Sequence, residues 1–126
     1  MPYQKFDSGA FLERLTKFGQ RCQKLVVQLP KTQYNFNYGD QLIRSSSSPG
    51  ANYIEALEAL GSKDFIHKLR ISRKETKESV YWLRMVQSSN SEILNIQNEI
   101  NELAEEGRQV VRLLTSSIIT LEKKNL

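Results

Sequence analysis

The sequence predicts an all-α protein, folded as an antiparallel up-down-up-down four-helix bundle. Apolar residues recur at steps of three and four along four segments, which is the spacing of one helical face. The 126 residues include only three prolines and six glycines. The segments between the apolar runs are short, as in bundles of antiparallel neighbours. We expect a single domain over residues 1–126.

The first helix is expected over residues 8–29, after a short lead-in at residues 1–6. Asp7 is a good N-cap, because its side chain can accept a hydrogen bond from the first turn. The apolar seam repeats in heptad steps: Phe11, Leu15, Phe18, Cys22, Leu25 and Leu29. Pro30 lacks a backbone donor and should end the helix.

The second helix is expected over residues 38–60, with residues 30–37 as the preceding loop. Its centre, residues 45–51, is rich in serine and has weak helix propensity. That segment is either a linker or a small-residue patch that another helix approaches closely. Pro49 should kink or split the helix near Ser45–Ser48.

The third helix is expected over residues 62–87 and the fourth over residues 91–123. Helix three carries an apolar or small stripe whose central members are Ser72, Thr76 and Ser79. We expect this small stripe to face the small patch of helix two, because a short connection makes the two helices antiparallel neighbours.

Composition limits the possible partners and location. The net charge of +4 permits an anionic partner without requiring one. The only cysteine, Cys22, lies on an apolar stripe and is expected to be a buried hydrophobe. The N-terminus lacks a signal-peptide pattern, and no window reaches 18 apolar residues. We therefore expect a cytoplasmic protein with no membrane partner.

Neither a catalytic nor a metal-binding motif is present, so we predict no enzyme, no cofactor and no metal. A di-iron bundle needs Glu-x-x-His pairs on two helices, whereas this chain has one histidine, His67, and no glutamate at position 64. The carboxylates weighed for such a site are Glu55, Glu75 and Glu78, and structural salt bridges explain them better. The serines at 45–48 lack a nucleophile-elbow context.

The most specific functional signal is a basic stripe on helix three. It lies nearly opposite the apolar stripe and comprises Lys63, His67, Arg70, Lys74, Lys77, Tyr81 and Arg84. Basic residues with an interleaved aromatic suit a nucleic-acid backbone with an occasional base contact. The alternative is a solvated outer face, because Glu75 and Glu78 beside the stripe partly neutralise it.

Helix one carries a second basic row beside its seam: Arg14, Lys17, Arg21 and Lys24. This row strengthens a nucleic-acid interpretation only if the two rows adjoin in the folded protein. Five apolar residues also fall outside the main seams of helices one and four: Leu12, Val26, Val111, Leu113 and Ile119. They predict a second contact surface and therefore a homo-oligomer.

Residues 41–86 resemble the four-helix-bundle proteins encoded in intervening sequences of bacterial large-subunit ribosomal RNA genes. The resemblance depends on the order and spacing of these elements: Gln41-Leu42, Arg44-Ser45, Gly50-Ala51-Asn52, Glu55-Ala56, Asp64-Phe65, Lys74-Glu75, Glu78 and Tyr81-Trp82-Leu83. Before this stretch, Leu29-Pro30-Lys31 also fits the family's first loop. At Pro49 the family usually has an apolar β-branched residue, so helix two should bend more sharply here.

The resemblance implies a left-handed antiparallel bundle that assembles into a pentamer, in a family most of whose members have no established activity. It also implies a relationship to the accessory proteins of diversity-generating retroelements, whose basic barrel binds nucleic acid and a reverse transcriptase. Our first hypothesis is a non-enzymatic oligomer that binds RNA or DNA, and the second is a protein-interaction or assembly module. An enzyme is the third and least supported.

Overall fold

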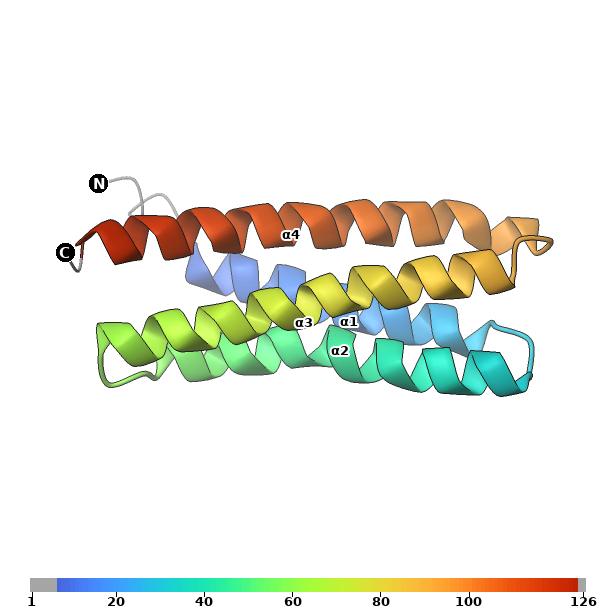
Figure 1. Ribbon diagram of the computed structural model, residues 1–126, viewed down its shortest axis with the longest axis horizontal. Helices are drawn as coiled ribbons and strands as arrows, with labels where there is room; N and C mark the ends of the chain where they lie inside the picture. Colours follow the sequence, from blue (N-terminus) through green and yellow to red (C-terminus); the bar gives the residue numbers. More distant parts are fainter. Residues whose placement is uncertain (1–6, 125–126) are drawn as a thin grey trace.

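The computed structural model describes residues 7–124, which form four long helices and one short 3₁₀ helix (Figure 1). The elements are α1 (Ser8–Val27), α2 (Gln33–Leu57), α3 (Ser62–Ser89), η2 (Leu94–Ile96) and α4 (Gln97–Lys124). Within this described range there is no strand, so the all-α prediction is confirmed. The lead-in at residues 1–6 lies outside it.

Each helix runs back along the bundle past the one before it, as Figure 1 shows. Helix α1 packs on α2 and α4, and α3 also packs on α2 and α4. Helices α1 and α3 therefore occupy opposite corners of the bundle. The antiparallel order matches the expected up-down-up-down arrangement, and the left-handed turn remains a prediction.

Two predicted boundaries at the α1–α2 connection were wrong. Helix α1 ends at Val27, and α2 begins at Gln33, five residues before the predicted start. Thr32 is the N-cap of α2, and its hydroxyl accepts a hydrogen bond from the Asn35 amide at 3.2 Å. Low helix propensity made residues 33–37 look like a loop, but this cap and the burial of Asn35 keep them helical. The other end of α2 is Leu57 instead of residue 60.

The predicted start of the fourth helix at residue 91 was also too early. Helix α3 continues to Ser89, and η2 precedes α4, which begins at Gln97. The Gln97 side-chain amide donates to the carbonyl oxygens of Asn90 and Ile93 at 2.9 and 3.2 Å. These bonds satisfy turn carbonyls that a longer helix would have used, so the turn is stable without helical geometry.

The core consists of two apolar clusters, one toward each end of the bundle. The first is centred on Phe18, Cys22 and Leu83, and the second on Phe11, Tyr53 and Leu114. All four long helices contribute to both. The seam of α1 predicted from its heptad spacing is buried along its whole length, from Phe11 to Leu29.

A seam of small polar residues joins α2 to α3 between these clusters. The hydroxyl groups of Ser45 and Ser79 share a hydrogen bond of 2.9 Å, and Ser72 donates to the Pro49 carbonyl at 2.8 Å. These three serines are completely buried. The predicted meeting of the two small stripes is therefore confirmed. Within residues 7–124, no buried polar side-chain atom lacks a hydrogen-bond partner.

Pro49 does not split α2, which continues without interruption from Gln33 to Leu57. The linker alternative was therefore wrong. A proline in a helix interior costs about 3 kcal/mol, and the buried residues Leu42 and Tyr53 on either side compensate for it. A bend at Pro49 remains a prediction.

Candidate nucleic-acid interface

The basic stripe predicted for helix three lies on the surface of α3. All seven positions are exposed: Lys63, His67, Arg70, Lys74, Lys77, Tyr81 and Arg84. Arg70 forms an ion pair with Glu122 of α4. Among the described residues, Lys63, Lys74, Lys77 and Arg84 have no ion-pair partner. Four of the five bases in the stripe therefore keep their charge available to a ligand.

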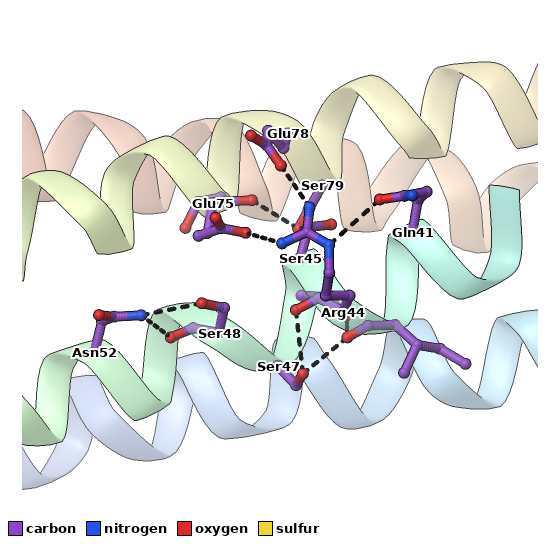
Figure 2. A network of polar contacts seen from close by, with 12 residues as sticks. Gln41, Arg44, Ser45, Ser47, Ser48, Asn52, Glu75, Glu78 and Ser79 are labelled. Atoms are coloured by element: carbon purple, nitrogen blue, oxygen red, sulfur yellow. Dashed lines mark hydrogen bonds and ion pairs between the residues drawn. The ribbon is translucent and has the colours of Figure 1, made fainter.

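The two acidic residues beside the stripe are bound from the other side by Arg44 of α2 (Figure 2). The Arg44 guanidinium donates to Glu75 at 3.0 Å and to Glu78 at 2.7 Å. The hydrogen bond to Glu78 is the main cause that raises the pKa of Arg44. One positive charge offsets part of two negative ones, and both carboxylates are directed toward α2. Because they are held on the side of α2, Glu75 and Glu78 neutralise little of the positive charge on the side of the stripe near α4. The sequence analysis had expected these two residues to neutralise the stripe in part.

The basic row of α1 is arranged differently, because α4 supplies acids to it. Arg14 donates two hydrogen bonds to Glu106, at 2.6 and 2.8 Å, and Arg21 donates two to Glu99, at 3.1 and 2.7 Å. These bonds raise the pKa of both arginines. Such bidentate pairs hold α1 against α4, and they neutralise the positive charges of Arg14 and Arg21. Half of the row is therefore structural.

The remaining bases of the row, Lys17 and Lys24, are exposed on α1. They lie at the opposite corner of the bundle from α3. The two basic rows accordingly do not adjoin within one chain, and the α1 row adds nothing to the α3 stripe unless a second copy brings them together.

Two arginines of α4 extend the α3 stripe, and the sequence analysis missed them. An open groove of about 280 Å³ lies between α3 and α4. Lys77, Arg108 and Arg112 line it together with two apolar residues, Val80 and Val111. Arg112 pairs with Glu105 at 3.5 Å, whereas Arg108 has no ion-pair partner in the described part of the chain.

The register of α3 against α4 explains why this groove forms. A Cβ atom on Gly107 would lie 2.7 Å from the Cγ2 atom of Val80, so the two helices approach closely there. Arg108 follows directly and Arg112 one turn later, which places them beside Lys77. The spacing of the two arginines was visible in the sequence, but the identity of their neighbours depends on this register.

The carboxylates weighed for a metal site each have a cationic partner. Glu55 accepts a hydrogen bond from Lys68 at 2.9 Å, and Arg44 binds Glu75 and Glu78. Residues 7–124 contain no group of three or more side chains that could hold a metal ion. In the same range, none of the helices is long and apolar enough to cross a membrane.

Comparisons with known proteins agree with this fold. A crystal structure of a protein of unknown function from the S23 ribosomal protein family of Bacteroides thetaiotaomicron superimposes with a TM-score of 0.77. It shares 30% sequence identity, and the match covers 88% of this chain and 96% of that one. No curated protein matches the sequence significantly. The model of the 23S rRNA-intervening sequence protein family matches residues 11–116. The chain, whose bundle the sequence pattern and the structure both describe, therefore belongs to the 23S rRNA-intervening sequence protein family.

Proposed function

We propose that this protein is a non-enzymatic, homo-oligomeric helical bundle that binds RNA or DNA. The binding surface is the cationic face, defined as Lys74, Lys77 and Arg84 of α3 with Arg108 and Arg112 of α4. The observation that carries the proposal is the convergence of Lys77, Arg108 and Arg112 on one groove. Lys74 and Arg84 are exposed beside Lys77 on the same stripe of α3. Among the described residues, Glu105 is the one ion-pair partner of the cationic face, and its contact with Arg112 is a long one at 3.5 Å. A solvated face with no ligand would be expected to mix charges of both signs.

The chemistry of the cationic face suits a phosphate backbone. Lysine and arginine bind phosphate oxygens and release condensed counterions, which makes the affinity fall steeply with salt. Arg108 and Arg112 are one turn apart, so their Cβ atoms are separated by about 6 Å. Val80 and Val111 form an apolar floor between the cations. Nothing in this arrangement reads base identity, so binding is weakly selective for sequence.

Assembly is the second part of the proposal, because one chain carries only a modest net charge of +4. Repeating the cationic face around an axis strengthens the field that a polyanion meets. Exposed apolar residues support such assembly: Ile54 and Leu57 on α2, and Leu113 and Ile119 on α4. The family resemblance favours a pentamer.

Of the five extra apolar residues from which we predicted assembly, only two are available in the structure for contact with another copy. Leu12 and Val26 pack against the core of their own chain, and Val111 lines the groove. Leu113 and Ile119 remain as candidates.

Light scattering at micromolar concentration should give about five times the monomer mass. Replacing Ile54 and Leu57 with Glu, or Leu113 and Ile119 with Glu, should identify which pair forms the contact, and a monomeric parent would disprove assembly.

The resemblance to retroelement accessory proteins extends the proposal to an accessory role. In that role the oligomer would hold a cytoplasmic RNA or DNA strand for a partner protein.

The test of nucleic-acid binding is a filter-binding titration of labelled RNA and DNA at several salt concentrations. Reversing Lys74, Lys77 and Arg84 to Glu should abolish binding while leaving the helical circular dichroism signal unchanged, because all three are exposed. The matched control reverses Lys17, Lys24 and Lys31, which are also exposed and unpaired in the described chain. It changes the net charge equally but should retain most of the affinity.

Arg14, Arg21 and Arg70 are left unchanged in both variants, because each forms an ion pair with α4. Equal loss of affinity in the two triple variants would show that only net charge matters. If the parent binds neither RNA nor DNA at low salt, the protein-interaction or assembly module takes the place of this proposal.

A further inference from the structure

Four aromatic rings form a continuous row across the outer surface of α2 and α3, beside the cationic face. Tyr34 and Tyr38 of α2 have ring centroids 6.5 Å apart, and Tyr38 stacks on Trp82 of α3 at 5.9 Å. Trp82 in turn forms a T-shaped pair with Tyr81, with ring centroids 5.0 Å apart. We call these four residues the aromatic row. Rings at such distances attract each other and restrict each other's motion.

The two ends of the aromatic row are exposed, whereas its middle is anchored. Tyr34 is 41% exposed and Tyr81 is 51% exposed. Tyr38 and Trp82 are partly buried and pack against the core cluster that contains Leu83. The terminal rings are therefore held in place by their neighbours while much of their surface remains open. A fixed and exposed ring can bind a planar partner with a smaller loss of side-chain entropy than a freely rotating one.

The aromatic row begins within the basic stripe of α3. Tyr81 follows Lys77 by four residues and precedes Arg84 by three, so all three share one helical face. Lys77 also lines the groove with Arg108 and Arg112. A path over the surface therefore passes from the cationic groove to Tyr81 and on along the row to Tyr34. Phosphate-binding groups and base-sized apolar surfaces alternate at its start.

We infer that this surface binds a single strand of nucleic acid, with bases stacked on Tyr81 and Tyr34 and phosphates held by Lys77 and Arg84. The inference rests on the proposed function and narrows its ligand to single-stranded RNA or DNA. Base stacking on aromatic side chains tolerates any sequence, because every base has a flat face. In a duplex the flat faces of the bases already stack on one another, so a duplex can use only the cationic part of the surface.

The proposal is tested with three ligands of equal length at one salt concentration: oligo(U), oligo(dT) and a DNA duplex. Replacing Tyr34 and Tyr81 with Ala should weaken binding of the single strands by at least about fivefold for each ring lost. Duplex affinity should change less than twofold. The slope of affinity against salt should stay at the parent value, because no phosphate contact has been removed. Comparison of oligo(U) with oligo(dT) separates RNA from DNA.

Two further variants separate stacking from other effects. Tyr81→Phe keeps the flat ring and should bind single strands as the parent does. Phe36→Ala removes an aromatic residue of α2 that is 55% exposed and belongs to no ring pair of the aromatic row, so it should also bind normally. Trp82 is the only tryptophan, so its fluorescence should change when a base stacks on Tyr81.

The outcomes distinguish this inference from the proposed function. Parent protein that binds no nucleic acid overturns the proposed function and, with it, this inference. Parent protein that binds strand and duplex equally, with the tyrosine variants unchanged, overturns the inference alone. The variant with both Tyr34→Ala and Tyr81→Ala could also lose single-strand binding because its oligomer dissociates, and light scattering detects this. In that case the aromatic row is an interface between copies, and the inference is wrong.

Discussion

Asn35 and Asn90 exchange two hydrogen bonds at one end of the bundle, although they are 55 positions apart. The Asn35 amide donates to the Asn90 side-chain oxygen at 3.0 Å, and the Asn90 amide donates back at 2.9 Å. The second proton of each amide goes to a main-chain carbonyl, that of Pro30 for Asn35 and that of Val86 for Asn90. This pair ties the start of α2 to the turn after α3.

Replacing Asn35 with Ala should lower the free energy of unfolding by about 1–3 kcal/mol, because it leaves the buried Asn90 amide without its partner. The double replacement of Asn35 and Asn90 should cost less than the sum of the single ones, since the two side chains share their bonds. Urea unfolding measures both effects. Asn98→Ala, at an exposed position of α4, is the control and should change stability by less than about 0.5 kcal/mol. Additive losses would show that the pair is not coupled.

Two helical glycines should respond to alanine in opposite directions. A Cβ atom on Gly19 of α1 would lie 2.8 Å from the main-chain carbonyl oxygen of Ser46, so the two helices would have to separate. We expect Gly19→Ala to destabilise the protein by about 1–3 kcal/mol. A Cβ atom on Gly50 of α2 meets nothing nearer than 3.8 Å. Gly50→Ala should therefore raise stability by about 0.5–1 kcal/mol through helix propensity.

Thermal unfolding of the two glycine variants provides the measurement, with each serving as the control for the other. An increase in melting temperature for Gly19→Ala would mean that α1 and α2 are less closely packed than the carbonyl contact indicates.

Stability should fall at alkaline pH because of Cys22. Burial of its side chain raises the pKa of the thiol from 9.0 to about 12. In the unfolded chain the thiol loses its proton above pH 9, while the folded protein keeps it until about pH 12. The unfolded state thus binds fewer protons in this window, and the free energy of unfolding should decrease by about 1.4 kcal/mol per pH unit.

Urea unfolding of the parent and of Cys22→Ala between pH 8 and pH 11 would show this effect. The variant should be less stable at pH 8, because it loses a buried side chain, but its stability should fall less steeply above pH 9. Burial also raises the pKa of Tyr53, and that contribution is common to both proteins. Parallel curves for the two proteins would rule out Cys22 as the cause.

The faces of the helices were predictable from the sequence, whereas the contacts between them were not. The seven exposed positions of the α3 stripe follow from helical periodicity alone. The pairing of Arg14 with Glu106 joins residues 92 positions apart and depends on how α4 is rotated against α1. The place of Arg108 in the groove likewise depends on the register of α4 against α3.

The helix boundaries failed where a tertiary contact outweighs local propensity. Residues 33–37 contain two asparagines and resemble a loop, but the bonds from Asn35 to Asn90 and Pro30 lie far outside any local window. The same holds at Pro49, where a residue that normally ends a helix lies between buried positions on both sides. The stabilisation that these tertiary contacts give to the helix cannot be estimated from the neighbouring residues in the sequence.

The ion pairs between α1 and α4 also affect how the molecule turns as it diffuses. Because Glu99 and Glu106 are bound to Arg21 and Arg14, these four charges cancel in pairs on the face between α1 and α4, while the neighbouring cationic face between α3 and α4 keeps an excess. The separated charge gives each chain an electric dipole moment across its long axis. A nearby polyanion exerts a torque on that dipole, so α3 swings toward the strand before any atoms touch. Orientation during approach is thus a consequence of bonds made on a neighbouring face of the bundle.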